Sequence, residues 1–146
     1  MRISVVNLQA VYALRKGFIR SVVREALPSC LRNRKRVGGV LDKLGEILIA
    51  LLGDEEIGRV HLQFFNDARP TDVITFPYGE VVLGVGEIVR NAKLNGCSPE
   101  EEVARCLVHA LLHLQGYEDR TETGYEEMVR EQELILAEVR KKLKIP

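Results

Sequence analysis

Two histidines and an aspartate near the C-terminal end of the chain have the types and spacing of metal ligands. His109 and His113 stand four residues apart, so on a helix their imidazoles project from one face and can converge on one ion. Gly116 can adopt the left-handed conformation that ends a helix and reverses the chain, which would bring Asp119 back toward them. Two imidazole nitrogens and one carboxylate oxygen suit Zn²⁺ and leave a fourth position for water. The segment therefore predicts one catalytic zinc ion held by His109, His113 and Asp119.

Zinc binding is not the only role open to these residues. The histidines could be core residues that each bond a carbonyl, but two of only three histidines at ligand spacing favour a metal. Cys106 lies three residues before His109 and could reach the ion, although a free cysteine is more often a small buried hydrophobe. His61 is predicted to be structural. Nickel, iron or manganese could occupy the same ligands.

The spacing also fits the metzincin protease pattern HExxHxxGxxH, with an aspartate as the third ligand. Those proteases need a glutamate after the first histidine as general base, and Ala110 stands there. A methyl group cannot take a proton from water, so Ala110 argues against peptidase action. A metal-dependent hydrolase of peptides or small molecules remains as an alternative.

Hydrophobic periodicity and turn residues divide the chain into helices and strands that would position these ligands. The strongest helix signal covers residues 98–115, because Ser98 is a good N-cap, Pro99 suits the first turn and Glu101 the capping box. This helix is apolar on most of its circumference, which predicts a buried central helix. A second capping box at 123–126 predicts a last helix with Tyr125, Met128, Ile135 and Val139 inward. The other expected elements are strands 2–7, 57–65, 73–76 and 81–89 (with Gly84 and Gly86 marking a bulge or close backbone approach), and helices 10–27 (stopped by Pro28) and 40–52.

Length and composition indicate one ordinary globular domain, spanning residues 1–146. The longest apolar run, 47–52, is far too short to span a bilayer, and the N-terminus does not read as a signal peptide. We therefore expect no association with a membrane. Three cysteines without a CxxC pair favour a reducing, cytoplasmic setting.

Charge is unevenly distributed along the chain. Residues 1–43 hold ten Lys or Arg and two acids, whereas the remainder holds eleven bases and nineteen acids. The basic side is densest at residues 32–36 and can neutralise the phosphates of a polyanion. It could equally pair with the acidic half of the same molecule.

Three segments resemble the motifs of the YbeY family, the bacterial rRNA maturation factors described as zinc-dependent, single-strand-specific endoribonucleases. Residues 109–119 resemble the signature His-Gly-x-Leu-His-Leu-x-Gly-Tyr-Asp-His, and residues 70–77 resemble Pro-Thr-Asp/Asn-Val-Leu-Ser-Phe-Pro. Residues 85–88 correspond loosely to Leu-Gly-Asp-Ile. Their order and distances agree with the family's, so the resemblance spans the chain.

This resemblance implies an α+β domain: a small mixed β-sheet packed with helices, the metal site lying on the buried helix and the turn after it. It implies cleavage of single-stranded RNA or rRNA in ribosome maturation, by zinc-activated water attacking a phosphodiester, with ribosomal particles as partners. A non-enzymatic RNA-binding module for ribosome assembly is a further alternative.

The chain departs from the family's pattern at several positions. Asp119 replaces the third histidine ligand, Ala110 replaces a glycine, and Phe65 stands where the family usually has an arginine. Arg69 is a candidate substitute for that arginine, and Thr71 and Asp72 complete the expected substrate-binding residues. The general base is not identified by these motifs; Glu118 is an available acid beside Asp119. Oligomeric state is not indicated.

Overall fold

A computed structural model describes residues 1–146 and contains one four-stranded mixed sheet and five α-helices. The strands lie in the order β1-β2-β4-β3; β1, β2 and β4 are parallel, and β3 is antiparallel to β4. This arrangement confirms the α+β expectation. None of the helices combines the length and apolarity needed to cross a membrane. In chain order the elements are β1 (Arg2–Asn7), α1 (Lys16–Arg32), a 3-10 helix (Leu41–Lys43), β2 (Glu46–Leu52), α2 (Asp54–Phe65), β3 (Val73–Phe76), β4 (Glu80–Gly84), α3 (Val85–Asn95), α4 (Pro99–Leu114) and α5 (Glu122–Leu143).

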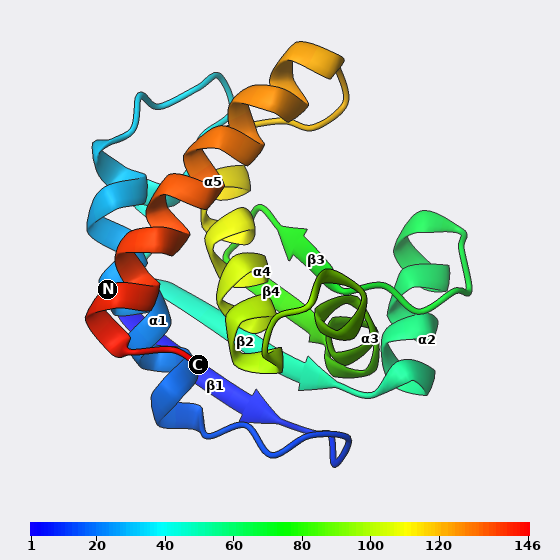
Figure 1. The fold of residues 1–146 in the computed structure, drawn as a ribbon. Coiled ribbons are helices and arrows are strands. Elements are labelled where there is room, and N and C mark those ends of the chain that lie inside the picture. Colours follow the sequence, from blue (N-terminus) through cyan, green and yellow to red (C-terminus); the bar gives the residue numbers. More distant parts are fainter.

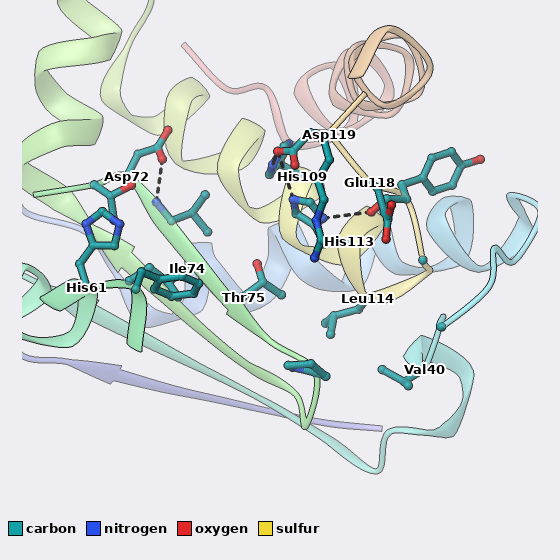
Figure 2. A pocket seen from close by; sticks show the side chains of 18 of the residues that line it. Val40, His61, Asp72, Ile74, Thr75, His109, His113, Leu114, Glu118 and Asp119 are labelled. Atoms are coloured by element: carbon teal, nitrogen blue, oxygen red, sulfur yellow. Dashed lines mark hydrogen bonds and ion pairs between the residues drawn. The ribbon is translucent and has the colours of Figure 1, made fainter. Parts of the chain in front are cut away.

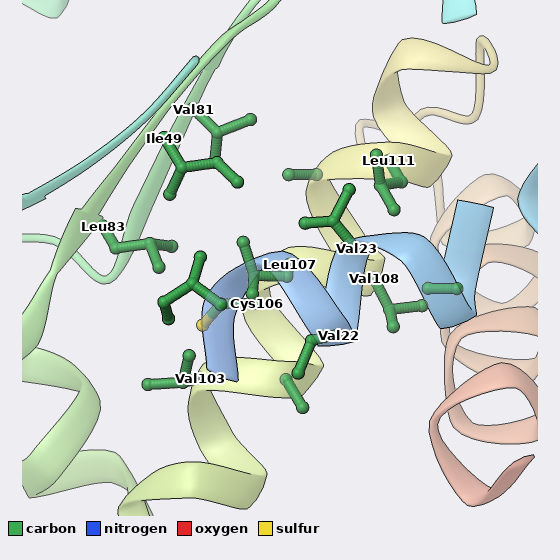
Figure 3. Close-up of a cluster of buried hydrophobic side chains, with 14 of the residues drawn as sticks. Val22, Val23, Ile49, Val81, Leu83, Val103, Cys106, Leu107, Val108 and Leu111 are labelled. Carbon is green, nitrogen blue, oxygen red and sulfur yellow. The ribbon is translucent and has the colours of Figure 1, made fainter. Parts of the chain in front are cut away.

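Helix α4 lies at the centre of the molecule, between the sheet and the pair α1 and α5 (Figure 1). Alternate residues of β2, such as Ile47 and Ile49, point to this side and are almost fully buried. Figure 3 shows Leu107 and Leu111 of α4 packed among side chains of α1 and the sheet. The main core contains 31 buried residues, so α4 is held rigidly and confirms the expected buried central helix.

The opposite face of the sheet carries a smaller core beneath α2. Five buried side chains form it: Leu52, Ile57, Ile74, Phe76 and Val82. Ile57 of α2 packs with Ile74 and Phe76 of β3 in this smaller core, whereas α4 contacts β3 from the main core, so the two helices lie on either side of this strand.

The predicted helix over 40–52 is wrong. A 3-10 turn at Leu41–Lys43 leads instead into β2, which pairs with β1 on one side and β4 on the other. A central parallel strand is covered on both faces and has a nearly continuous apolar run, although in β2 only alternate residues are fully buried; in so short a run this pattern also fits a helix. The pairing with two neighbouring strands decided the outcome.

The predicted strand over 57–65 is also wrong, because these residues belong to α2. Three acidic residues in its first turn, Asp54, Glu55 and Glu56, favour a helix N-terminus. The apolar residues that alternate in this segment do not form a buried face, since Leu62 and Phe64 are half exposed. The expected strand 81–89 ends at Gly84, where α3 begins.

Two helix ends differ from expectation. Helix α1 begins at Lys16 rather than Ala10, because the Gln9 side chain accepts hydrogen bonds from the backbone of residues 11 and 12 and holds a loop there. It continues through Pro28 to Arg32, since Ala26 and Cys30 pack into the core on either side of the proline. Burial outweighs the cost of an interior proline, about 3 kcal/mol.

The N-cap of α5 lies two residues before the predicted cap at Thr123. Thr121 caps the helix by accepting a hydrogen bond from the Gly124 backbone N–H at 3.0 Å. Met128, Ile135 and Val139 face the core as expected, but Tyr125 is exposed.

Candidate metal centre

The predicted cap of α4 is present at its N-terminus. The Ser98 hydroxyl accepts a hydrogen bond from the Glu101 backbone N–H at 3.1 Å, and Pro99 occupies the first helical position. The carboxylate of Glu101 does not close a capping box but pairs with Arg105 and Arg140. The cap sets where the helix starts and therefore the face on which His109 and His113 emerge.

Helix α4 ends at Gly116 in a turn that two backbone hydrogen bonds close. The Gly116 N–H donates to His113 O at 2.9 Å, and the Tyr117 N–H donates to Leu112 O at 3.0 Å. These two bonds form a Schellman motif, which needs a left-handed residue at the glycine. Gly116 supplies it with φ +103°, and the chain turns back beside the helix it has just left.

This reversal brings the three predicted metal ligands together. The Asp119 Oδ2 atom lies 3.7 Å from His109 Nε2 and 3.6 Å from His113 Nε2. Figure 2 shows the three side chains facing one another. Ligand atoms around a tetrahedral zinc ion lie about 3.4 Å apart, so a small contraction would complete the coordination. The donor set and its geometry fit a transition-metal ion.

The second nitrogen of each imidazole is occupied by a hydrogen bond. His113 Nδ1 donates to Tyr117 O at 3.0 Å, and His109 Nδ1 lies 2.7 Å from Gln132 Oε1 on α5. A ring that donates through Nδ1 has its lone pair on Nε2. Both rings are thus held in the tautomer that presents Nε2 toward Asp119.

The orientation of the Gln132 amide follows from its neighbour. Its Nε2 donates to the Glu133 carboxylate at 3.0 Å, and that carboxylate also accepts from Arg105 on α4. Burial is the largest single influence and raises the pKa of Glu133, but the hydrogen bonds from Arg105 and Gln132 and the charges of Arg105 and Arg140 together lower it by more. The net shift is therefore downward, and the group is an acceptor only. The Gln132 amide oxygen must therefore face His109.

Electrostatics keep His113 neutral. Burial lowers the pKa of this imidazole, and a positive charge on neighbouring His109 would lower it again. The rings stand nearly perpendicular, with centroids 4.6 Å apart. A metal ligand must be deprotonated, so a lowered pKa favours metal binding at neutral pH.

The three side chains open into a cleft of about 610 Å³. Its walls come from the loop at 37–40, from α2, from residues 71–77 and from the turn after α4 (Figure 2). Between 23% and 42% of the surface of each ligand side chain is exposed. The exposed side of a bound ion would thus face a space large enough for part of a polymer.

The predicted substrate-binding residues do not all lie in this cleft. Thr71 and Asp72 line it, because Gly84 has no Cβ to collide with the Thr71 carbonyl. That confirms the close approach expected at Gly84. Arg69 points away: its guanidinium pairs with Asp67 at 2.6 Å and is 85% exposed. Substrate binding stays a prediction for all three residues.

Cys106 lies apart from the three ligands. Its thiol is 3.9 Å from Asp72 Oδ2 and forms a second group with Asp72 and Glu102. Burial raises the pKa of Cys106 well above its usual value, which keeps it a thiol. The structure thus places Cys106 with Asp72, whereas Glu118 lines the cleft beside Asp119.

Backbone hydrogen bonds attach the basic segment at residues 32–36, and the loop after it, to the end of α4 beside the cleft. The Arg36 N–H donates to Gln115 O, and the Val40 N–H donates to Leu114 O, so this loop is joined to the end of α4. Part of its charge is paired internally, Arg36 with Glu127 at 3.0 Å and Lys35 with Asp42 at 3.2 Å. Pairing with the acidic half of the molecule is therefore confirmed for Arg36, and phosphate binding by this segment stays a prediction.

Sequence reasoning missed several residues of the site. Gln132 lies 23 positions from His109, and nothing local marks it as a partner. His61 and Phe65 line the cleft from α2, whereas His61 was predicted to be a structural residue of a strand. Arg120 also lines the cleft, is exposed and forms no ion pair. Its position directly after a proposed ligand was the available signal.

Comparison with known proteins agrees with this geometry. The profile of the family described as "Endoribonuclease YbeY" matches residues 5–140. The chain is 34% identical to the endoribonuclease YbeY of Rubrobacter xylanophilus over 85% of its own length and 90% of the relative's. It is 34% identical to that of Nautilia profundicola over 69% and 74% of the two chains. A Thermotoga maritima protein of known solution structure shares the fold with a TM-score of 0.67, at 22% identity over 97% of this chain and 91% of the other. The chain belongs to the endoribonuclease YbeY family.

Proposed function

We propose that residues 1–146 form a single hydrolase domain that cleaves single-stranded RNA with one zinc ion held by His109, His113 and Asp119. The observation that carries this proposal is the meeting of three ligand atoms, each within 4.8 Å of the others, in a cleft of a chain from an endoribonuclease family. When bound, zinc lowers the pKa of water toward about 7 and polarises a phosphoryl oxygen.

The residues of the chain then have distinct tasks. Gln132 and the Tyr117 carbonyl orient the two imidazoles, so the rings lose little conformational entropy when the ion binds. Arg120 lines the cleft, and the basic residues 32–36 directly precede its wall at 37–40, so both are placed to neutralise phosphate charge of a bound strand. Thr71 and Asp72 contact the substrate from the wall formed by residues 71–77.

Peptide hydrolysis is disfavoured by the residue after His109. Ala110 is fully buried and offers only a methyl group, so no general base stands at the position that metzincins use. The proposal therefore keeps RNA as substrate and treats peptides as a control.

A cleavage assay with purified protein tests the function. We expect cleavage of a single-stranded RNA to be lost on chelation, to return with zinc, and to be at least about 100-fold slower in His113→Ala. Asp119→Ala should lose bound metal in elemental analysis while its circular dichroism is unchanged. RNA binding with steep salt dependence but no metal-dependent turnover would support a non-enzymatic assembly module instead.

The place of action belongs to the same proposal. All three cysteines are free, and two are buried, as suits a reducing compartment. We assign the protein to the cytoplasm and to rRNA processing on ribosomal particles. Co-sedimentation with ribosomal subunits, and accumulation of unprocessed rRNA in cells that lack the protein, are the expected results. Normal rRNA in such cells would contradict this assignment.

A further inference from the structure

Two adjacent phenylalanines at the end of α2 have equal exposure but different surroundings. Phe64 and Phe65 are each 55% exposed. Phe64 packs edge-on against Phe76 with ring centroids 5.0 Å apart, over the smaller core. Phe65 instead pairs with His61, one turn earlier, at 5.7 Å, and both line the cleft. The rings of His61 and Phe65 thus form an aromatic surface inside the cleft.

Hydrogen bonds fix His61 and the turn that follows Phe65. His61 Nδ1 lies 2.8 Å from the Arg69 carbonyl, which joins the helix to the turn that follows it. Asn66 ends α2 in the left-handed conformation, and Asp67 clamps Arg69 through its backbone N–H and its guanidinium. A surface ordered in advance loses little conformational entropy when a ligand stacks on it.

The pair also stands at a useful place relative to the metal ligands. Figure 2 shows His61 and Asp72 on one side of the cleft and His109, His113 and Asp119 on the other. The wall at residues 71–77 extends from Asp72 toward the metal ligands and presents polar Thr71, Asp72 and Thr75 as well as apolar side chains. A chain whose scissile phosphate lies at the metal ligands could therefore reach the aromatic pair with a neighbouring nucleotide.

We propose that Phe65, with His61 behind it, is a stacking site for an unpaired base of the RNA substrate. This inference rests on the proposed function and supplies a physical source for single-strand preference. An unpaired nucleotide can turn its base out onto an aromatic face, whereas a base inside a duplex is already stacked on both sides. A charged side chain at position 65 would attract the phosphates of single-stranded and duplex RNA alike. Phenylalanine has no charge and offers an aromatic face on which an unpaired base can stack.

Binding measured in chelator separates this site from catalysis. The probe is a short single-stranded oligoribonucleotide that carries 2-aminopurine, whose fluorescence is quenched by stacking. With the full chain we expect Phe65→Leu to bind about tenfold more weakly and to lose the quench. Phe65→Trp should keep both. Phe64→Leu is the matched control, equally exposed on the same helix, and should behave as wild type.

A duplex and a kinetic readout complete the experiment. Affinity for a blunt duplex of the same sequence should change less than twofold in Phe65→Leu. The ratio of the affinities for single-stranded and duplex RNA should therefore fall in this variant. In cleavage assays Phe65→Leu should raise KM more than it lowers kcat. Wild-type affinity and quench in Phe65→Leu, or an equal loss in Phe64→Leu, would overturn the stacking site while leaving the nuclease proposal intact. Normal stacking without metal-dependent cleavage would overturn the nuclease proposal alone.

Discussion

The orientation of His109 depends on a residue from another helix. Gln132 on α5 accepts from this imidazole, and Gln132 is itself fixed by Glu133, which bonds Arg105 on α4. The chain of bonds begins and ends on α4, so the two helices lock the same ring. Partners behind a metal ligand commonly determine its affinity, because they set the tautomer and the ring angle before the ion arrives.

Replacement of Gln132 by leucine should therefore weaken metal binding by 10- to 100-fold, as a rough estimate. Without an acceptor at Nδ1, the His109 ring can rotate and can carry its proton on Nε2. Titration against a competing chelator measures the change, and thermal unfolding checks that the fold remains. Gln63→Leu is the same chemical change at an exposed position of α2 and should leave affinity unaltered. Equal affinity in both variants would show that Gln132 does not act on the site.

At the scale of elements, the turn between α4 and α5 has two tasks in a few residues. It ends α4 through the paired backbone bonds at Gly116, and it returns Asp119 to the two imidazoles. A Cβ at Gly116 would lie 2.7 Å from the Arg36 carbonyl, so the turn also packs tightly against the basic loop. Metal ligation and the position of the basic loop are thus coupled through one glycine.

Gly116→Ala should cost both stability and metal affinity. A positive φ in an L-residue costs about 1–2 kcal/mol, and the collision with Arg36 adds to it and displaces the turn. Gly96→Ala isolates the first effect, because Gly96 has φ +66° at the end of α3 and open space around it. Urea unfolding should show a loss in both variants, larger for Gly116→Ala, and metal titration a loss in Gly116→Ala only. Unchanged metal affinity in Gly116→Ala would separate the turn from the site.

At the scale of the whole molecule, polar contacts join α1 and the loop after it to acidic residues of α5. Ser29 donates to Glu138, Asn33 donates to Glu131, and Arg36 pairs with Glu127. Beneath these contacts, Cys30 is fully buried in the main core. Burial raises the pKa of the Cys30 thiol to about 12 from its usual value near 9.

This burial predicts a loss of stability at alkaline pH. Above pH 9 the unfolded chain releases the Cys30 proton and the folded chain retains it until about pH 12, so the free energy of unfolding falls as pH rises. Between these values the wild type should lose about 1.4 kcal/mol per pH unit more than Cys30→Ala. Urea unfolding in reducing buffer at pH 8, 9, 10 and 11 measures the two slopes. Parallel slopes would show that the thiol ionises in the folded protein.

The sequence alone determined the features that short-range chemistry specifies. The spacing of the two histidines, the helix-ending glycine and the cap at Ser98 each act within a few residues, and all three appear where expected. Strands 2–7 and 73–76 were also found, because turn residues or loops bound them closely. The family motifs extended this local information to the fold class.

Only the tertiary structure decided the middle of the chain and the surroundings of the ligands. Residues 40–52 and 57–65 are short apolar segments that fit a helix or a strand, and sheet pairing and packing chose between them. That choice put His61 and Phe65 on a helix facing the cleft. Gln132 reached His109 only because α5 packs on α4. Such contacts join residues far apart in sequence, and local propensity contains no information about them.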